Sequence, residues 1–414
     1  MPQTQNTPIA AGIDIGSSAV RCVIGMYEEG APAPSVVGVG TAPSHGVRKG
    51  TVVDIEETVS AITAAVDEAE RISGLTLDGA TINVNGKHVE TMFSRGIIAV
   101  GSNNREITAD DLSRAEEAAT VMQLPPNREI IQTYPQHYTV DGQDHVKDPV
   151  GMSGMRLEVE TCLVTASTPF LKNTVRSLKQ AGGLESRGRI ATPLAATKAV
   201  TAKQDIETGC VVVDIGAHTT GIAVMEEGEL LYTAVLPIGS SHITNDIAIG
   251  LRTDLQVAES IKLKHVNVHP DYQPQTESIN LEELNGEPLQ AQVADVNHMA
   301  QARLEEIFQL VNKQLQRVKR DGMLPAGAIL CGGGANLDGI SEYAKQVLKL
   351  PAHTKAPHGF SGIVDKIQDP AYAAVVGLML EDLYGGHSSG DGKISGVFSD
   401  LGRSITDILG RFRE

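Results

Sequence analysis

The sequence predicts an α/β protein of two lobes, with a small α+β subdomain inserted in the first lobe and an amphipathic helix at the C-terminus. Its 414 residues, 41% of them hydrophobic, are too many for one ordinary core and suit two. An apolar strand that ends in Asp-x-Gly occurs twice, at Asp14 and Asp214, 200 positions apart (214 − 14). Between these repeats, residues 84–164 read as short strands around one helix, a pattern typical of a small inserted module.

The first lobe is expected to open with three strands and a helix. Apolar runs at 10–16, 20–25 and 36–39 are separated by turns and predict a meander. A helix should follow Asp54, which can cap it, with Glu57 three residues on as the capping-box partner. Its apolar stripe is formed by Ile55, Val59, Ile62, Val66 and Ala69.

The remaining elements are predicted from the spacing of apolar residues, which recur every second residue in strands and about every 3.6 residues in helices. The module carries a helix at 110–122, and a second set of strands opens at Cys210. The region 267–290 is polar and is expected to be loop with short strands, and 328–334 is expected to be a strand with a glycine turn. Further helices are predicted at 169–181, 193–203, 241–251, 256–264, 293–320 and 370–383.

These elements divide the chain into expected domains. The core ranges are 9–83 and 165–200 for the first lobe, 84–164 for the inserted subdomain, 201–364 for the second lobe and 365–384 for a return to the first lobe. Residues 1–8 are expected to be a disordered N-terminus, 385–396 a flexible linker and 397–414 the amphipathic helix.

Composition excludes several classes of protein. The formal net charge of −17 argues against a nucleic-acid partner, because phosphate binding needs a basic face. The four cysteines form no C-x-x-C pair, which indicates buried reduced thiols. The polar start of the chain has no signal-peptide pattern, and no apolar run reaches the roughly 20 residues of a membrane span.

The two Asp-x-Gly segments suit phosphate and Mg²⁺ binding. Backbone N–H groups in a tight turn after a strand can hold a phosphate, and a carboxylate on the strand can hold Mg²⁺ through its waters. One such segment alone more often marks a plain hairpin, but two at matched positions favour a shared site. A Rossmann site is excluded, because strands rather than helices follow both turns. The first set of candidates is Asp14, Gly16, Ser17, Ser18, Asp214, Gly216, Ala217, His218 and Thr219, with Asp14 and Asp214 as the magnesium pair.

A third glycine cluster completes the candidate nucleotide site. Gly332, Gly333, Gly334 and Asn336 follow an apolar strand, and three adjacent glycines offer a flat surface for an adenosine. This order of loops resembles the actin, Hsp70 and sugar-kinase superfamily, which implies an ATP site with Glu259 and Lys262 near the ribose and base. That pair could equally be an ordinary surface pair one helical turn apart. Gly239 could bring a helix N-terminus to a phosphate or simply form a turn at the start of the helix.

Several stretches narrow the resemblance to the FtsA family of division proteins. They are GVRKG at 46–50, NVNGKH at 83–88, DPVGMSGMRL at 148–157 and DPAYAAVVGL at 369–378, and with the loop order they cover nearly the whole chain. The resemblance implies ATP binding, filament formation, binding of the FtsZ tail and recruitment of later division proteins at the septum. Ala217 and His218 replace glycines of the usual D-I-G-G-G-T, and a Cβ fits a left-handed turn poorly, so hydrolysis is expected to be slow or absent. No general base is evident.

The same resemblance points to a partner face on the long helix. Arg303 and Glu306 match an R-x-x-E on the helix whose lobe receives the FtsZ tail in that family. The alternative is a solvated charged face, which the sequence favours equally.

The tail has a clean apolar face. At 100° per residue, its seven apolar side chains fall within about 120° of arc: Val397, Phe398, Leu401, Ile405, Ile408, Leu409 and Phe412. A helix behind a flexible linker is suited to lie in a membrane interface, on the cytoplasmic face of the inner membrane in this family. The alternative is a helix that docks on its own lobe or on a neighbour.

Three functions compete at this point. The first is an ATP-binding, membrane-attached, actin-like division filament that recruits FtsZ. The second is a small-molecule kinase of the same superfamily, which would need a general base. The third is a pilus-assembly scaffold of the PilM type, which shares the fold and the module. Neither rival needs the C-terminal helix, and an Hsp70 chaperone is excluded because no substrate domain follows.

Overall fold

The structure is a computed structural model that describes residues 8–28, 30–31, 33–101, 104–274, 278–280 and 290–384. The predicted linker at 385–396 and the predicted membrane helix at 397–414 lie outside the described residues, as does nearly all of the N-terminus at 1–8. No helix in the described ranges is both long and apolar enough to cross a bilayer.

The first lobe is built on a six-stranded mixed sheet of order β11-β6-β1-β2-β3-β19. The predicted meander is its centre, since β1 pairs antiparallel with β2 and β2 with β3, while β6 lies parallel to β1. The strands are β1 (Ile9–Ile15), β2 (Ala19–Met26), β3 (Ser35–Pro43), β6 (Gly79–Val84), β11 (Glu185–Ala191) and β19 (Ser361–Gly362); a small hairpin, β4 (Val47–Arg48) and β5 (Thr51–Val52), lies beside it.

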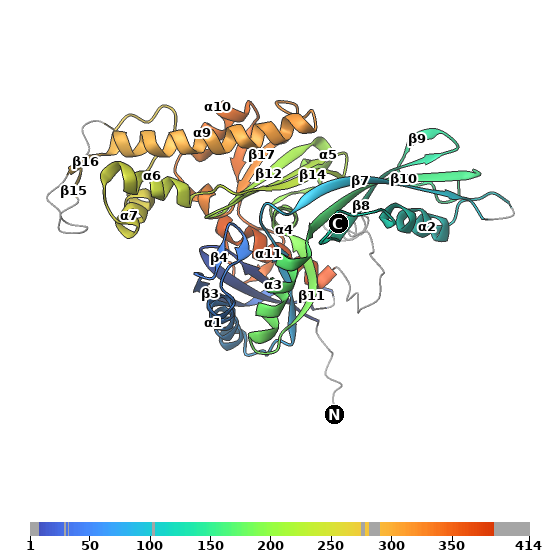
Figure 1. Cartoon of the computed structure of the whole chain (residues 1–414), viewed down its shortest axis with the longest axis horizontal. Helices are drawn as coiled ribbons and strands as arrows, with labels where there is room; N and C mark the ends of the chain where they lie inside the picture. The colour runs from blue at the N-terminus through green and yellow to red at the C-terminus, as the bar shows by residue number, and fades with distance from the viewer. Residues whose placement is uncertain are drawn as a thin grey trace.

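Helices cover both faces of this sheet (Figure 1). On one face lies α1 (Ile55–Ser73), which packs its stripe on the sheet with α3 (Thr168–Gln180) beside it. Asp54 caps α1 as predicted, because its side chain accepts from the Glu57 N–H. The predicted capping box is not completed, since the Asp54 N–H donates to the Gly46 carbonyl instead. On the other face lie α4 (Thr192–Val200) and α11 (Ala373–Tyr384), which begins after a short 3-10 turn, η2 (Pro370–Tyr372). These two helices share one core with the sheet of the second lobe.

The second lobe repeats the plan with a five-stranded sheet of order β14-β13-β12-β17-β18. Its strands are β12 (Cys210–Ile215), β13 (Thr220–Glu226), β14 (Glu229–Leu236), β17 (Gly327–Cys331) and β18 (Ala352–Thr354). One face packs on a large helical core with the fully buried Phe308 at its centre. The helices are α5 (Lys203–Thr208), α6 (Ser241–Leu251), α7 (Leu255–His265), α9 (Val293–Arg317) and α10 (Ile340–Leu348), with η1 (Gly333–Asn336) after β17 and a small ladder, β15 (Ser278–Asn280) with β16 (Gln290–Gln292).

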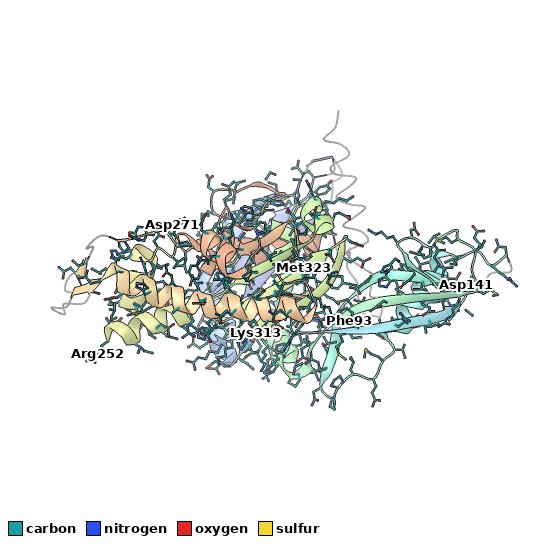
Figure 2. The ribbon with its side chains drawn as sticks, turned by 90° about the horizontal axis from the view of Figure 1, so that it is seen from above. Phe93, Asp141, Arg252, Asp271, Lys313 and Met323 are labelled. Atoms are coloured by element: carbon teal, nitrogen blue, oxygen red, sulfur yellow. The ribbon has the colours of Figure 1, made fainter. Side chains whose placement is uncertain are left out.

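The inserted subdomain, called the insert below, is a four-stranded antiparallel sheet of order β7-β10-β8-β9 with one helix. A Cβ on Gly96 would lie 1.9 Å from the carbonyl oxygen of Ala115, so the helix packs directly against β7. The insert projects to one side, so that Asp141 at its outer end and Arg252 at the end of α6 lie at opposite ends of the molecule (Figure 2). Its elements are β7 (Glu90–Ala99), α2 (Ala109–Thr120), β8 (Arg128–Val140), β9 (Gln143–Val146) and β10 (Arg156–Ser167).

The architecture confirms the predicted fold class. Some elements differ from expectation: α10 was not predicted, and the helix predicted at 193–203 ends at Val200, with α5 as a separate short helix. Thr201 is extended, and the Asp205 carboxylate accepts from the Ala202 N–H, which starts the second helix. The residue boundaries expected for the lobes remain predictions.

Candidate functional site

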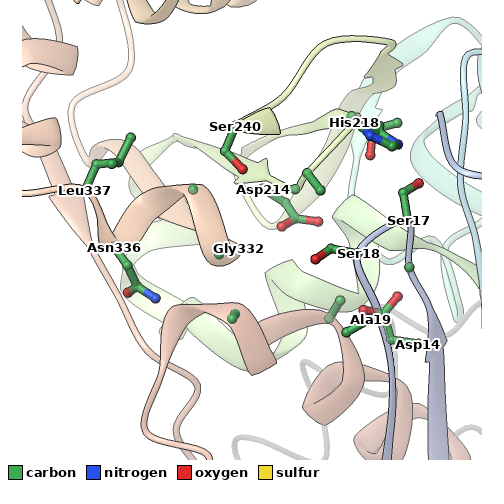
Figure 3. A pocket seen from close by; sticks show the side chains of 18 of the residues that line it. Asp14, Ser17, Ser18, Ala19, Asp214, His218, Ser240, Gly332, Asn336 and Leu337 are labelled. Carbon is green, nitrogen blue, oxygen red and sulfur yellow. The ribbon is translucent and has the colours of Figure 1, made fainter. Parts of the chain in front are cut away.

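A single cleft between the lobes gathers most of the candidate residues. It has a cavity volume of about 230 Å³. In Figure 3, Asp14 and Ser18 lie on one side, Asp214 and Ser240 on the other, and Gly332 and Asn336 close one end. The predicted residues that line it are Asp14, Gly16, Ser17, Ser18, Asp214, Gly216, Ala217, His218, Thr219, Glu259, Lys262, Gly332, Gly333, Gly334 and Asn336.

The two Asp-x-Gly segments form the same turn. In the first, the Gly16 N–H donates to the Ala19 carbonyl at 3.2 Å, and in the second the Gly216 N–H donates to the Thr219 carbonyl at 2.8 Å. Each turn joins two antiparallel strands, β1 to β2 and β12 to β13. The internal repeat seen in the sequence is therefore a repeat of geometry, with one turn from each lobe facing the same cleft.

The expected conflict at Ala217 and His218 does not arise. Neither residue has a positive φ, so a side chain at these positions causes no backbone strain. The prediction that a Cβ at these two positions fits the turn poorly is therefore wrong.

The two strand-end carboxylates are buried and electrostatically coupled. Asp14 is 7% exposed and Asp214 is 9% exposed. Burial raises the pKa of Asp14 to about 6, opposed by the charge of Arg21. Burial, together with the charge of Asp14, raises the pKa of Asp214 to about 7. A carboxylate pair of this kind gains from a cation that neutralises both charges.

The cleft also holds two polar atoms without hydrogen-bond partners. The Nε atom of Arg21 and the Nδ1 atom of His218 are both buried and unpartnered in the described part of the chain. Arg21 faces Asp14 across the β1–β2 ladder, and its guanidinium stacks on the Tyr372 ring with its Cζ atom 5.3 Å from the centroid. Burial and the charges of His242, Arg48 and Lys49 lower the pKa of His218. Basic groups thus gather at the end of the cleft formed by the two turns, which suits phosphate oxygens.

The triple glycine lies against the second turn, and its first and third positions leave no room for a side chain. Gly332 has φ +78°, and a Cβ on it would lie 2.3 Å from Asp214 Oδ1. A Cβ on Gly334 would lie 2.5 Å from Ile215 Cγ2. Gly333 is exposed, and the nearest atom to a Cβ there is 3.8 Å away. Asn336 donates to Asp369 Oδ1 at 2.8 Å, which fixes this loop to the start of η2.

Glu259 and Lys262 pair at the wall of the cleft, with Lys262 buried and Glu259 partly exposed. Lys262 is only 5% exposed, and its Nζ atom lies 2.7 Å from Glu259 and 3.0 Å from Thr244 Oγ1. Both line the cleft from α7, so the alternative of an ordinary surface pair does not hold for Lys262.

Gly239 lies behind the cleft, not in its wall. A Cβ on it would lie 2.4 Å from the Gly216 carbonyl oxygen. The N–H groups of Ser240 and Ser241 donate to the carbonyls of Gly216 and Ala217, both at 2.9 Å. The start of α6 therefore supports the second turn, and Ser240 lines the cleft instead.

Sequence reasoning missed several lining residues. Arg21 could have been found, because it follows Val20 in the second strand of the hairpin and lies directly opposite Asp14. Asn85 and Thr192 carried no signal, since they follow strands that end at the cleft only in the folded chain. The others are Ala19, Ser240, Leu263, Val266, Leu337, Asp338, Ala371 and Ala374.

A magnesium ion fits this cleft only together with phosphate. No cluster of three His, Cys, Asp or Glu side chains able to hold a metal occurs among the described residues. Mg²⁺ normally keeps several waters and takes one or two carboxylates plus phosphate oxygens. The pair Asp14 and Asp214 meets that requirement.

The predicted partner residues are engaged within the chain. Arg303 makes two bonds to Asp246 of α6, at 2.7 and 2.8 Å, and also pairs with Glu306. Arg303 is 24% exposed and thus does not belong to a simple solvated face. The seven predicted membrane residues, Val397 to Phe412, lie outside the described residues.

Two family models and relatives from other organisms match this chain. Residues 211–377 match the family model "Cell division protein FtsA", and residues 86–165 match "SHS2 domain inserted in FTSA". The chain is 34% identical over 395 residues to the cell division protein FtsA of Pseudomonas aeruginosa, covering 95% of this chain and 93% of that protein. It is 35% identical over 375 residues to that of Bacillus subtilis, covering 90% of this chain and 83% of that protein.

Solved structures show the same fold at low identity. The PilM–PilN type IV pilus biogenesis complex matches with a TM-score of 0.63 and 17% identity, over 90% of this chain and 98% of that chain. MreB5 of Spiroplasma citri bound to ADP matches with a TM-score of 0.52 and 13% identity, over 92% and 97%. These likenesses, with the inserted subdomain, confirm the predicted actin-like ATPase fold.

Proposed function

The chain belongs to the FtsA family of cell division proteins, and we propose that it binds ATP with Mg²⁺ between its lobes, forms actin-like filaments on the inner face of the cytoplasmic membrane, and tethers FtsZ filaments there. Later division proteins are recruited by the same assembly at the division septum. Family membership favours this function over a pilus scaffold or a small-molecule kinase.

The matched pair of turns carries the nucleotide proposal. Each lobe supplies one turn and one buried carboxylate, and Arg21 and His218 leave polar atoms unpartnered beside them. Phosphates and a hydrated Mg²⁺ complement this arrangement. The neighbour MreB5 was solved with ADP and with AMPPNP, which supports a nucleotide at the same place in this fold.

We expect slow or absent ATP hydrolysis because of where the carboxylates lie in the cleft. Asp14 and Asp214 are assigned to the magnesium shell, so neither is free to act as a base. The other lining carboxylates, Glu259 and Asp338, lie on the side of α7 and η1, where the ribose and base are placed. Among the lining residues that the structure describes, no carboxylate at the phosphate end is then left to activate water.

Calorimetric titration with ATP tests nucleotide binding directly. The full chain should bind ATP with Mg²⁺ and bind it more weakly with EDTA. Asp214→Asn should lose the magnesium dependence while keeping a folded protein. ATP that fails to bind at any magnesium concentration contradicts the proposal.

Membrane attachment is proposed from the apolar arc of residues 397–414. The arginines at 403, 411 and 413 are balanced by Asp400, Asp407 and Glu414, so binding rests mainly on the apolar face. Many weak anchors in one filament add by avidity. Vesicle co-sedimentation with ATP should pellet the full chain but not a chain truncated after Gly396. Equal behaviour of the two chains refutes the anchor.

Binding of the FtsZ C-terminal tail is proposed near Arg303 and Glu306 on α9. Fluorescence anisotropy with a labelled tail peptide should show about tenfold weaker binding for Arg303→Ala, the loss of roughly one charge-assisted bond. Asp246→Ala is the matched control, because it breaks the same internal pair but keeps the cation. Equal losses in both variants would mean that the pair only holds α9 against α6.

A further inference from the structure

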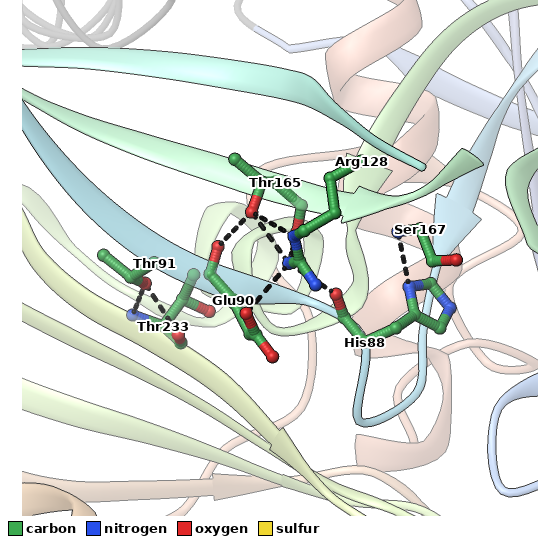
Figure 4. Close-up of polar contacts among 7 residues, drawn as sticks. All are labelled: His88, Glu90, Thr91, Arg128, Thr165, Ser167 and Thr233. Carbon is green, nitrogen blue, oxygen red and sulfur yellow. Dashed lines mark hydrogen bonds and ion pairs between the residues drawn. The ribbon is translucent and has the colours of Figure 1, made fainter. Parts of the chain in front are cut away.

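The chain passes from the first lobe into the insert through Asn85–Thr91, called the crossover segment below. It follows β6 and runs into β7, and both of its ends bond to the second lobe. The Asn85 side chain donates to Thr219 Oγ1 in the second turn at 3.2 Å. Thr91 Oγ1 donates to the Thr233 carbonyl at 2.7 Å and accepts from the Thr233 N–H at 2.9 Å (Figure 4). The segment thus links the nucleotide cleft to the edge strand β14.

The middle of the crossover segment is held differently. The His88 ring stacks on Phe170 of α3, with centroids 4.8 Å apart, and its Nδ1 atom accepts from the Ser167 N–H at 3.3 Å. Burial and the charge of Arg128 lower the pKa of His88 to about 4, so the ring is neutral and Nδ1 can accept. This contact fixes the centre of the segment to the first lobe.

Arg128 joins the two chain segments that connect the insert to the first lobe. Its guanidinium donates to the carbonyl of His88 at 2.9 Å and to the hydroxyl of Thr165 at 2.8 Å, and it pairs with Glu90 at 3.2 Å (Figure 4). The incoming and outgoing strands are therefore clamped together, and the base of the insert behaves as one unit.

Beyond its base, the insert is bonded to the second lobe. Gln136 donates to the Leu230 carbonyl at 2.8 Å, and Lys147 Nζ donates to the Glu227 carbonyl at 3.2 Å. With Thr91, these side chains bind main-chain groups of β14 and of the turn before it. At its base the insert contacts the first lobe, where Gln132 accepts from the Ala191 N–H at 3.2 Å, Glu129 pairs with Arg189 at 2.7 Å, and apolar side chains of β8 and β10 share a core with α4 and α11.

We propose that the insert moves as one body with the second lobe, pivots on the first lobe at Glu129 and Gln132, and so reports the closure of the nucleotide cleft. Asn85 carries the signal, because it lines the cleft and its bond to Thr219 spans the two lobes. Gly50, whose N–H bonds to Ser17 Oγ at 3.2 Å, packs against Asn85 and connects it to the first turn as well. The inference rests on the proposed function only in that a bound nucleotide closes the cleft.

Spin-label distance measurements test this directly. The four native cysteines are buried, so introduced thiols are labelled selectively. Gln143→Cys on β9 places a label on the insert, Asp67→Cys on α1 marks the first lobe, and Lys313→Cys on α9 marks the second, all at exposed positions. On addition of ATP and Mg²⁺, the 143–67 distance should shift while the 143–313 distance stays unchanged.

Thr91→Val removes the hydroxyl that joins the crossover segment to β14 and keeps the shape of the side chain. In this variant the 143–313 distance distribution should shift or broaden on nucleotide binding. Thr120→Val is the matched control, because the Thr120 hydroxyl bonds only to the Glu117 carbonyl inside the insert. A urea midpoint near that of the parent chain establishes that Thr91→Val is folded.

Each outcome is decisive. A 143–67 distance that stays constant while ATP binds overturns the inference and leaves the proposed function intact. A 143–313 shift in the parent chain, equal to the 143–67 shift or larger, shows that the insert does not move with the second lobe and also overturns it. Absence of ATP binding by calorimetry refutes the proposed function and removes the signal on which the inference depends.

Discussion

The buried carboxyl groups of Asp14 and Asp214 make the empty cleft sensitive to pH. Their pKa values, raised to about 6 and about 7, exceed the ordinary value of 3.8 for an unfolded chain. Between pH 3.8 and about pH 7 the folded protein therefore binds more protons than the unfolded chain. Stability of the nucleotide-free protein therefore falls as pH rises from about 4 to about 7.

Asp214→Asn should reduce the loss of stability that the nucleotide-free protein shows as pH rises. At pH 8 the nucleotide-free variant should be more stable than the parent by on the order of 1–3 kcal/mol, and near pH 4 the two should melt together, because the parent carboxyl is then neutral. Thermal unfolding at both pH values measures the difference. A variant that melts below the parent at pH 8 contradicts the burial argument.

Two neighbouring glycines should differ sharply in their tolerance of a side chain. Gly332→Ala places a Cβ against Asp214 Oδ1 and requires an unfavourable φ, which alone costs about 1–2 kcal/mol. Gly333→Ala meets open space and should change stability by less than about 0.5 kcal/mol. Urea midpoints of the two variants make the comparison. Equal destabilisation would mean that the triple glycine is not held against the second turn.

Single residues also show what the sequence could and could not predict. Asp14 and Asp214 were identifiable because each ends an apolar strand with a glycine turn, a local pattern. Asn85 was not, because its role depends on Thr219, 134 positions away. For Lys262 the sequence left a surface position open, since its burial arises from packing of α7 that no local pattern records.

At the level of elements, the crossing of α4 and α11 is the closest helix contact in the first lobe. A Cβ on Gly377 would lie 1.7 Å from the Ala195 carbonyl oxygen, so the helices touch backbone to backbone. Both helices also pack under the second lobe's sheet. This crossing thus sets how the two lobes meet.

Gly377→Ala should therefore cost about 3 kcal/mol, because neither backbone can yield without moving a whole helix. Gly250→Ala in α6 is the matched control: its Cβ meets only the flexible end of Met299, and alanine favours the helix by about 1 kcal/mol. Urea unfolding should lower the midpoint of the first variant and leave that of the second equal or higher. A tolerated Gly377→Ala would show that the crossing is loosely packed.

Element types were predictable where periodicity was strong, as for α1, α6 and α9. The end of α4 was not, because Thr197 and Thr201 have ordinary helical neighbours in the sequence and the break comes from the extended Thr201 and the cap at Asp205. The salt bridge of Arg303 with Asp246 was also hidden, since it joins helices 57 residues apart in the chain.

At the level of the whole molecule, charge opposes assembly. Copies of a chain with a net charge of −17 repel one another, and salt shortens the range of that repulsion from about 30 Å at 10 mM to about 8 Å at 150 mM. Filament formation with ATP should therefore rise with KCl over this range, as measured by light scattering and sedimentation. A decrease would show that opposite charges at the subunit contact outweigh the net repulsion.

The position of the insert has a consequence for solubility. β14 is the outer strand of the second lobe's sheet, and the insert bonds to its main chain through Thr91 and Gln136. An uncovered strand at that edge would offer free N–H and C=O groups to any passing strand and so invite aggregation. A chain with residues 86–165 removed would lose this shield. The insert thus covers part of an edge that would otherwise be open to pairing with other β-strands.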